Sequence, residues 1–409
     1  MFFCLFSVLL LPKKSMMRKR ILFLLLLKCL IITASAEDSI KIKHPKFVSF
    51  QVAEGIVLPT TQIVKEKTVF PNVAAMSFKY GLHAKGDRWE DIYYGMPYKG
   101  IGLYKPFYSL SREMGHPFSV YLFQGAQWKA FSSGLSLHYE INLGVSFRWR
   151  HYDVIDHPDF LALGSSVNAH LGGNIYFKKT LSNRLDLHLG MNFLHFSNGS
   201  LRTPNYGINS MAAIVELAYK IKPEKNTVAA KKPEVSPVEA EKRFVHDISF
   251  FVTRRSLTVD TAETKLKSKY PDHQFRVAGL NYACLWRQSY RFMWGPSVEA
   301  VYDEGQKATF SVPETRNKVS GKEIVQLGKV SERFSLGLSL KGELKMPGYS
   351  IFASLGYDIL SSNRSIEKRL YQIYGIKMYI TEGLSASFGV KSINLTQSRY
   401  LFASLGYSF

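Results

Sequence analysis

The sequence predicts an all-β protein, an antiparallel transmembrane β-barrel or a pair of them. Three observations predict this fold class. Apolar and polar residues alternate over long stretches, 46% of the residues are hydrophobic against 21% charged, and no apolar run reaches the length of about 18 residues that a membrane helix needs. The apolar content excludes a disordered chain, and 3 cysteines in 409 residues exclude a disulfide scaffold.

Residues 1–36 have the order of a secretory signal. Read from Met16 or Met17, basic residues precede an apolar stretch, and the small residues Ala34-Ser35-Ala36 follow it. Neither apolar run in this segment is long enough to anchor the chain as a helix. We therefore expect export, with the mature chain beginning at Glu37.

The clearest strand lies within residues 133–150. Its odd positions from Leu135 to Trp149 are apolar, and its even positions carry Gly, Ser, His, Glu, Asn and Arg. A period of two indicates a strand with one apolar and one polar face. The run exceeds the usual length of soluble strands, about 5–6 residues, which argues against a soluble β-sandwich. The same period recurs in residues 163–178, 334–344, 351–359 and 399–409.

The polar faces suit a barrel lumen and the apolar faces suit lipid, so the sheet must close to satisfy its edges. The segment 223–243, rich in Lys, Glu, Ala and Pro, breaks the pattern and predicts a linker between two modules, 37–222 and 244–409. Each module contains about eight predicted strands. Two small barrels or one large barrel both satisfy this count.

The last strand alternates from Leu401 to the terminal Phe409. An aromatic-ended final strand resembles the signal by which outer-membrane barrels are recognised for assembly. We therefore expect the bacterial outer membrane as the location, and the barrel-assembly machinery as a partner that recognises this strand.

The end of one predicted strand carries candidate chemistry. Residues 184–197 alternate from Leu185 to Phe193 on the apolar face, and His195 and Ser197 continue this face. A hydroxyl and an imidazole facing the acyl region of a membrane are groups that can attack an ester there. Asn209 lies on the same face of the next predicted strand, near its loop end, whereas Glu216 lies on the lumen face.

Two short motifs give these residues a family context. His195-Phe196-Ser197-Asn198-Gly199, followed by Pro204-Asn205-Tyr206-Gly207-Ile208-Asn209, resembles the outer-membrane lipid A 3-O-deacylases (PagL-type), also called acyloxyacyl hydrolases. The resemblance is sharp over these motifs and diffuse over about 45–222, and the second module shows no motif of the family. It implies a barrel of about eight strands with a Ser-His-acid triad on its outer surface.

The resemblance implies a role for each motif residue. Ser197 is then the nucleophile, His195 the general base and Asn198 an oxyanion donor. The acid of the family, usually Glu, falls on Asn209, an amide that can orient the imidazole but supplies no charge. This departure leaves open a slower triad, an acid from elsewhere or lost activity. The strand that bears His195 is the seventh in our count and is expected to end at the outer leaflet.

The leading hypothesis is an outer-membrane serine esterase that removes the 3-O-linked acyl chain of lipid A and so remodels lipopolysaccharide, without a metal or another cofactor. The alternative is a non-catalytic barrel, either a pore or a structural protein. The net charge of +21 is expected to meet lipid A phosphates and the anionic membrane surface rather than nucleic acid. Candidates for phosphate contact are Arg202, Lys307 and Lys318.

Overall fold

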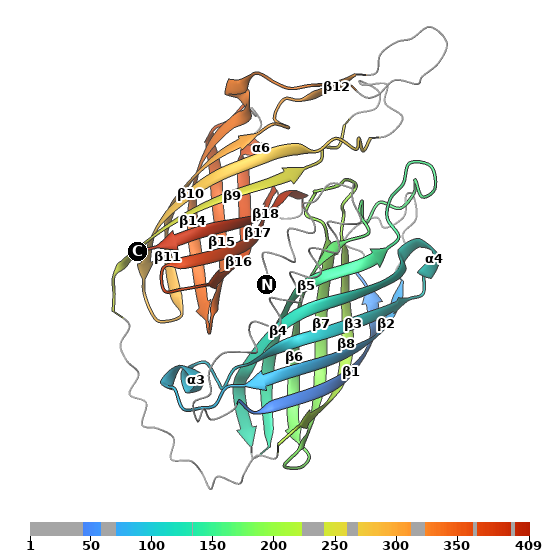
Figure 1. The fold of residues 1–409 in the computed structure, drawn as a ribbon, viewed down its shortest axis with the longest axis vertical. Helices are drawn as coiled ribbons and strands as arrows, with labels where there is room; N and C mark the ends of the chain where they lie inside the picture. The colour runs from blue at the N-terminus through green and yellow to red at the C-terminus, as the bar shows by residue number, and fades with distance from the viewer. Residues whose placement is uncertain are drawn as a thin grey trace, which may run out of the picture.

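The chain folds into two closed antiparallel barrels of eight strands each (Figure 1). The two-barrel alternative is therefore correct, and one large barrel is wrong. The signal segment expected at 1–36 and residues 223–240 of the expected linker lie outside the described residues. The computed structural model describes residues 44–58, 71–132, 134–222, 241–259, 269–311, 324–362, 366–393 and 397–409.

The first barrel closes by pairing its first strand with its last, and every other strand pairs with its neighbours in the chain. The segment around Trp89 is a short helix, and the strand that bears His195 is the seventh, as expected. The elements are β1 (Lys46–Val57), β2 (Asn72–His83), α3 (Trp89–Tyr93), β3 (Tyr98–Tyr108), α4 (Ser111–Met114), β4 (Gly115–Ser132), β5 (Leu135–Trp149), β6 (Asn168–Thr180), β7 (Leu185–Ser197) and β8 (Ile208–Lys220).

The second barrel closes by pairing β9 with β18, and a two-stranded sheet extends one of its loops. Its elements are β9 (Phe244–Arg255), β10 (Phe275–Arg287), β11 (Phe292–Asp303), β12 (Thr309–Ser311), β13 (Ile324–Gln326), the 3₁₀ helix η1 (Val330–Arg333), β14 (Phe334–Met346), β15 (Tyr349–Leu360), α6 (Ile366–Arg369), β16 (Leu370–Tyr379), β17 (Leu384–Ile393) and β18 (Gln397–Ser408). None of the helices in the described part of the chain is long and apolar enough to span a bilayer.

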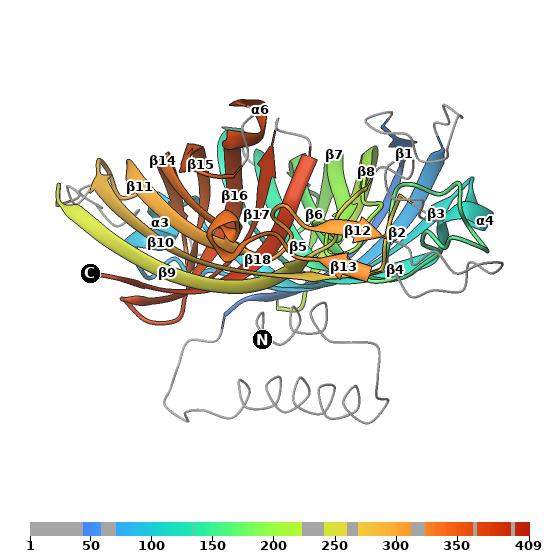
Figure 2. The ribbon, with the colours of Figure 1, turned by 90° about the horizontal axis from the view of Figure 1, so that it is seen from above.

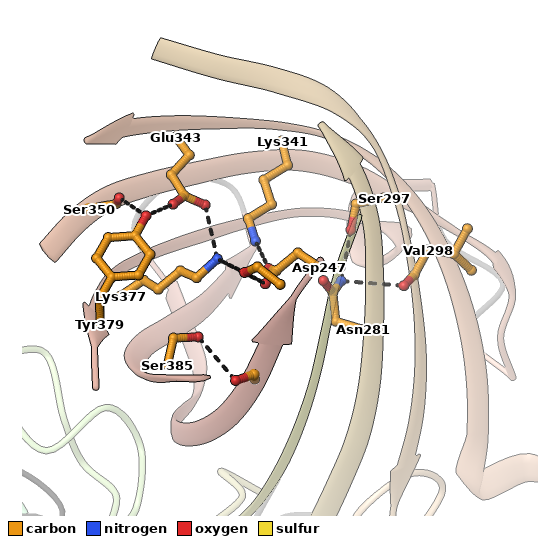
Figure 3. Close-up of polar contacts among 12 residues, drawn as sticks. Asp247, Asn281, Ser297, Val298, Lys341, Glu343, Ser350, Lys377, Tyr379 and Ser385 are labelled. Atoms are coloured by element: carbon orange, nitrogen blue, oxygen red, sulfur yellow. Dashed lines mark hydrogen bonds and ion pairs between the residues drawn. The ribbon is translucent and has the colours of Figure 1, made fainter. Parts of the chain in front are cut away.

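Side chains on the inner faces fill the two barrels. In the first barrel, Lys79 is 1% exposed and its ammonium lies 2.7 Å from a Glu140 oxygen and 2.9 Å from a Glu216 oxygen. In the second, Asp247 accepts from Lys341 and Lys377 (Figure 3). An eight-stranded barrel has an interior just wide enough for side chains, and these buried ion pairs occupy it.

The outer faces carry exposed apolar side chains, as the period of two predicted. On β7, Leu189, Met191 and Phe193 are 43–47% exposed, whereas the alternate residues Asn192 and Leu194 are buried. The pattern follows from the pleat, which points successive side chains to opposite faces of the sheet.

The barrels lie side by side (Figures 1 and 2). We call the end of each barrel at which its first strand begins the turn end, and the opposite end the loop end. At the turn end, Arg291 of the second barrel lies over the ring of Tyr93 of the first, and Trp89 packs on Tyr290. At the loop end, Arg202 of the first barrel lies 2.6 Å from Asp272 of the second. Like ends meet, so the two barrels point in the same sense.

An apolar seam joins the barrels between these ends. Leu143 of β5 forms a buried cluster with Phe388 of β17 and Leu401 of β18, and the partly buried Leu171 and Ile376 pack against it. All five side chains lie on outer faces, where neighbouring strands expose theirs. The second barrel therefore covers part of the lipid-facing surface of the first.

Candidate active site

His195, Ser197 and Asn209 lie together at the loop end of the first barrel, on its outer face. His195 Nε2 lies 2.7 Å from Ser197 Oγ, and His195 Nδ1 lies 2.6 Å from Asn209 Oδ1. The ladder between β7 and β8 pairs His195 directly with Asn209. Directly opposed residues in a sheet have adjacent side chains, so the register itself positions this contact.

The chain of contacts defines the protonation of the imidazole. Asn209 Oδ1 can only accept, so the Nδ1–H of His195 donates to it. The neutral imidazole then keeps its proton on Nδ1, and Nε2 is free to accept the proton of the Ser197 hydroxyl. This is the arrangement of a nucleophile, a base and an orienting group, with an amide as the third member.

The Pro-Asn-x-Gly-x-Asn motif forms the connection that holds this site. Asn205 Oδ1 accepts a hydrogen bond from the main-chain N–H of Asn198 at 2.9 Å. Gly207 has φ +80, and a Cβ atom at that position would lie 2.9 Å from Cε1 of His195. Only glycine fits both the left-handed backbone and the space against the imidazole.

Asn198, the expected oxyanion donor, is 1% exposed. Its main-chain N–H is used by Asn205, its side-chain amide donates to Ser165 Oγ at 3.1 Å, and its Oδ1 accepts from the N–H of Arg202 at 3.2 Å. One N–H of the side-chain amide has no partner among the described residues. That proton is the donor that Asn198 has left for an oxyanion, so the expected role stays a prediction.

Ser165 and its neighbours are contacts that the sequence did not indicate. The pattern predicted a strand from residue 163, but β6 begins at Asn168. Residues 160–165 instead bind the connection after β7: Ala162 O accepts from Gly207 N–H at 2.9 Å. The apolar residues there are buried against that connection. Their hydrophobic pattern is the same as that of a strand, so the pattern alone does not distinguish the two.

The expected phosphate contacts are not gathered at the site. Arg202 is bound to Asp272, and Lys307 is an exposed residue of the second barrel with φ +56. Lys318 lies outside the described residues. Ser197 itself is only 8% exposed, unlike the apolar residues that precede it on the same face.

The fold and the site define a double eight-stranded barrel with a Ser-His-Asn arrangement on the outer surface of its first barrel. Residues 246–409 match the family model of the acyloxyacyl hydrolase C-terminal domain, which confirms the resemblance to the acyloxyacyl hydrolase family. The match covers the second barrel, in which the sequence offered no motif, whereas the motifs lie in the first barrel.

Other comparisons are more distant. No curated protein matches the chain. The outer membrane enzyme PagL is 18% identical over 41% of this chain and 97% of its own, with a TM-score of 0.28. Neisserial surface protein A is 11% identical over 43% and 96%, with a TM-score of 0.29. An outer membrane channel from Pseudomonas putida F1 is 7% identical over 91% and 99%, with a TM-score of 0.21. These values are too low to support any functional conclusion.

Proposed function

We propose that this protein is an outer-membrane serine esterase that removes the 3-O-linked acyl chain of lipid A. The observation that carries the proposal is the hydrogen bond of 2.7 Å between Ser197 Oγ and His195 Nε2 on the outer face of a barrel. A nucleophile and its base placed there meet membrane lipid and not a lumen solute. The family match over residues 246–409 supports an acyloxyacyl substrate.

The proposed reaction has two halves. Ser197 Oγ attacks the ester carbonyl while its proton moves to His195 Nε2, and the remaining amide N–H of Asn198 donates to the oxyanion. The carbon–oxygen bond to the sugar then breaks, and the sugar oxygen takes the proton from His195. Water hydrolyses the acyl-Ser197 ester by the same route, with His195 again as the base.

Asn209 is the orienting group of this mechanism. Its carbonyl fixes the useful tautomer of His195, but it adds no negative charge to stabilise the imidazolium that forms in the transition state. We therefore expect a slow enzyme, because the positive charge that forms on His195 in the transition state has no negative partner.

The location belongs to the same proposal. Apolar outer faces, side-chain-filled lumens and an expected secretory signal all suit the bacterial outer membrane. The second barrel ends in β18 and the terminal Phe409, the segment that we propose the assembly machinery recognises.

The test is mass spectrometry of lipid A from cells with and without the protein, repeated with Ser197→Ala. Loss of one hydroxyacyl chain that requires Ser197 supports the esterase. Removing a serine nucleophile lowers turnover by about 10⁶-fold in well-studied cases, so the variant should give lipid A like that of cells without the protein. Unchanged lipid A with the folded wild-type protein present would refute the proposal and leave the structural barrel as its rival.

A further inference from the structure

The second barrel binds the segment that follows Ser197 and Asn198. Five consecutive residues, 199–203, contact it. A Cβ atom at Gly199 would lie 2.3 Å from Leu401 Cβ, and Ser200 Oγ donates to Ser398 O at 2.8 Å. The Leu201 carbonyl accepts from Ser256 Oγ at 2.9 Å and from Gln274 Nε2 at 2.7 Å. Arg202 pairs with Asp272 at 2.6 Å, and Thr203 Oγ1 donates to Leu257 O at 3.2 Å.

The contacts are buried where they matter most. Leu201 is 5% exposed and Ser256 is 5% exposed, so the Leu201 carbonyl has lost water as a partner. Two donors from the second barrel replace it. A buried carbonyl without a donor is costly, so the position of this segment depends on Ser256 and Gln274.

The segment is coupled to the site through Asn198. Asn198 Oδ1 accepts from the N–H of Arg202, which closes the segment into a loop directly after Ser197. A displacement of Leu201 therefore moves Asn198, and with it the side-chain amide that we propose as the oxyanion donor. The geometry of a reaction is sensitive to such shifts: about 1 Å can change a rate by about 10²-fold.

We propose that the second barrel is a positioning domain for the esterase site, and that it maintains the catalytic geometry of this site by binding residues 199–203. This inference rests on the proposed function. Ser256 and Gln274 are positioning residues that touch no substrate and act through Leu201. The second barrel thus contributes to the reaction of the first by positioning its residues.

The first experiment removes the grip in the full-length protein with Ser256→Ala combined with Gln274→Leu. We expect kcat to fall about 10- to 100-fold, with KM changed by no more than about twofold, because the lost contacts position groups and do not bind substrate. The matched control is Ser289→Ala with Gln288→Leu, the same substitutions at the turn end of the second barrel. The control should keep the wild-type kcat.

The second experiment restores the grip covalently. Ser200 Oγ and Ser398 Oγ lie 2.6 Å apart, so cysteines at both positions can form a disulfide between the barrels. In the Ser256→Ala/Gln274→Leu background, oxidation should raise kcat and reduction should lower it again. Comparing the two redox states of one molecule separates positioning from a folding defect.

The outcomes distinguish this inference from the proposed function. A wild-type protein that releases no acyl chain from purified lipid A refutes both. A wild-type protein that is active, beside a Ser256→Ala/Gln274→Leu variant with the wild-type kcat, refutes the positioning role and leaves the esterase standing. A variant that is slow in both redox states, although the disulfide has formed, also overturns the positioning role.

Discussion

Replacing Gly207 with alanine tests the geometry of the site at one atom. The added Cβ would lie 2.9 Å from Cε1 of His195, whereas ordinary contacts of this kind are 3.4–4 Å long. The imidazole must therefore move by roughly 0.5–1 Å, and its two nitrogens are already committed to Ser197 and Asn209. A shift of about 1 Å predicts a fall of about 10²-fold in kcat for acyl release.

Backbone strain must be separated from this clash. Gly207 has φ +80, and an alanine there costs about 1–2 kcal/mol of stability whatever it touches. Gly348, in the turn between β14 and β15, has φ +84 with nothing within 4 Å of the position of a Cβ. Gly348→Ala therefore carries the strain alone and should keep the wild-type kcat.

The assay is the initial rate of fatty-acid release from purified lipid A, followed by mass spectrometry. Stability is measured beside it as the temperature at which the compact folded band disappears from a gel. Both alanine variants should lose similar stability, and only Gly207→Ala should lose rate. Equal rates in the two variants would refute the assigned contact between Gly207 and the imidazole.

Three more predictions follow from the described contacts. Asn209→Asp keeps the shape of the orienting group and adds a negative charge beside His195, so kcat should rise about 10-fold or more in the same release assay. An unchanged kcat would argue against His195 as the base. Lys79→Met leaves Glu140 and Glu216 buried without their cation, which should lower the free energy of unfolding of the first barrel by about 3–5 kcal/mol. Denaturant titration measures this change, and an unfolding midpoint equal to that of the wild type would contradict the ion-pair network. Planar bilayers should show no steady channel currents, since buried side chains fill both lumens, and regular conductance steps would reinstate the pore.

The barrels are predictable from the sequence because the alternation of apolar and polar residues in each strand indicates which face is turned outward. The alternation on β7 predicts that His195 and Ser197 lie on the outer face, and the structure places them there. Asn209 was assigned to the same face of β8 by the same parity, and the register puts it opposite His195. A period of two encodes which face a side chain is on, and this information is local.

The connections were not predictable in this way. The stretch from residue 163 has the apolar composition of a strand, but Ser165 binds Asn198 in the connection after β7, and β6 begins only at Asn168. Arg202 is a basic loop residue, and only the position of the second barrel shows that it forms an ion pair with Asp272. Such contacts join segments that are far apart in the chain and leave no periodic signal.

The division of the site between ladder and loop explains why a second barrel is useful. His195 and Asn209 are paired inside the ladder of β7 and β8, whose last pair joins Phe196 to Ile208. Ser197 lies one residue beyond that pair and is held only from the side of β6, through Ala169. The base and its orienting group are thus fixed by the ladder of the first barrel, whereas Ser197 lies beyond the last pair of β7 and β8. Within the first barrel, the next residue, Asn198, is held by Asn205 and Ser165. The second barrel binds residues 199–203 and so adds contacts to the connection that follows the nucleophile, beyond the end of the ladder.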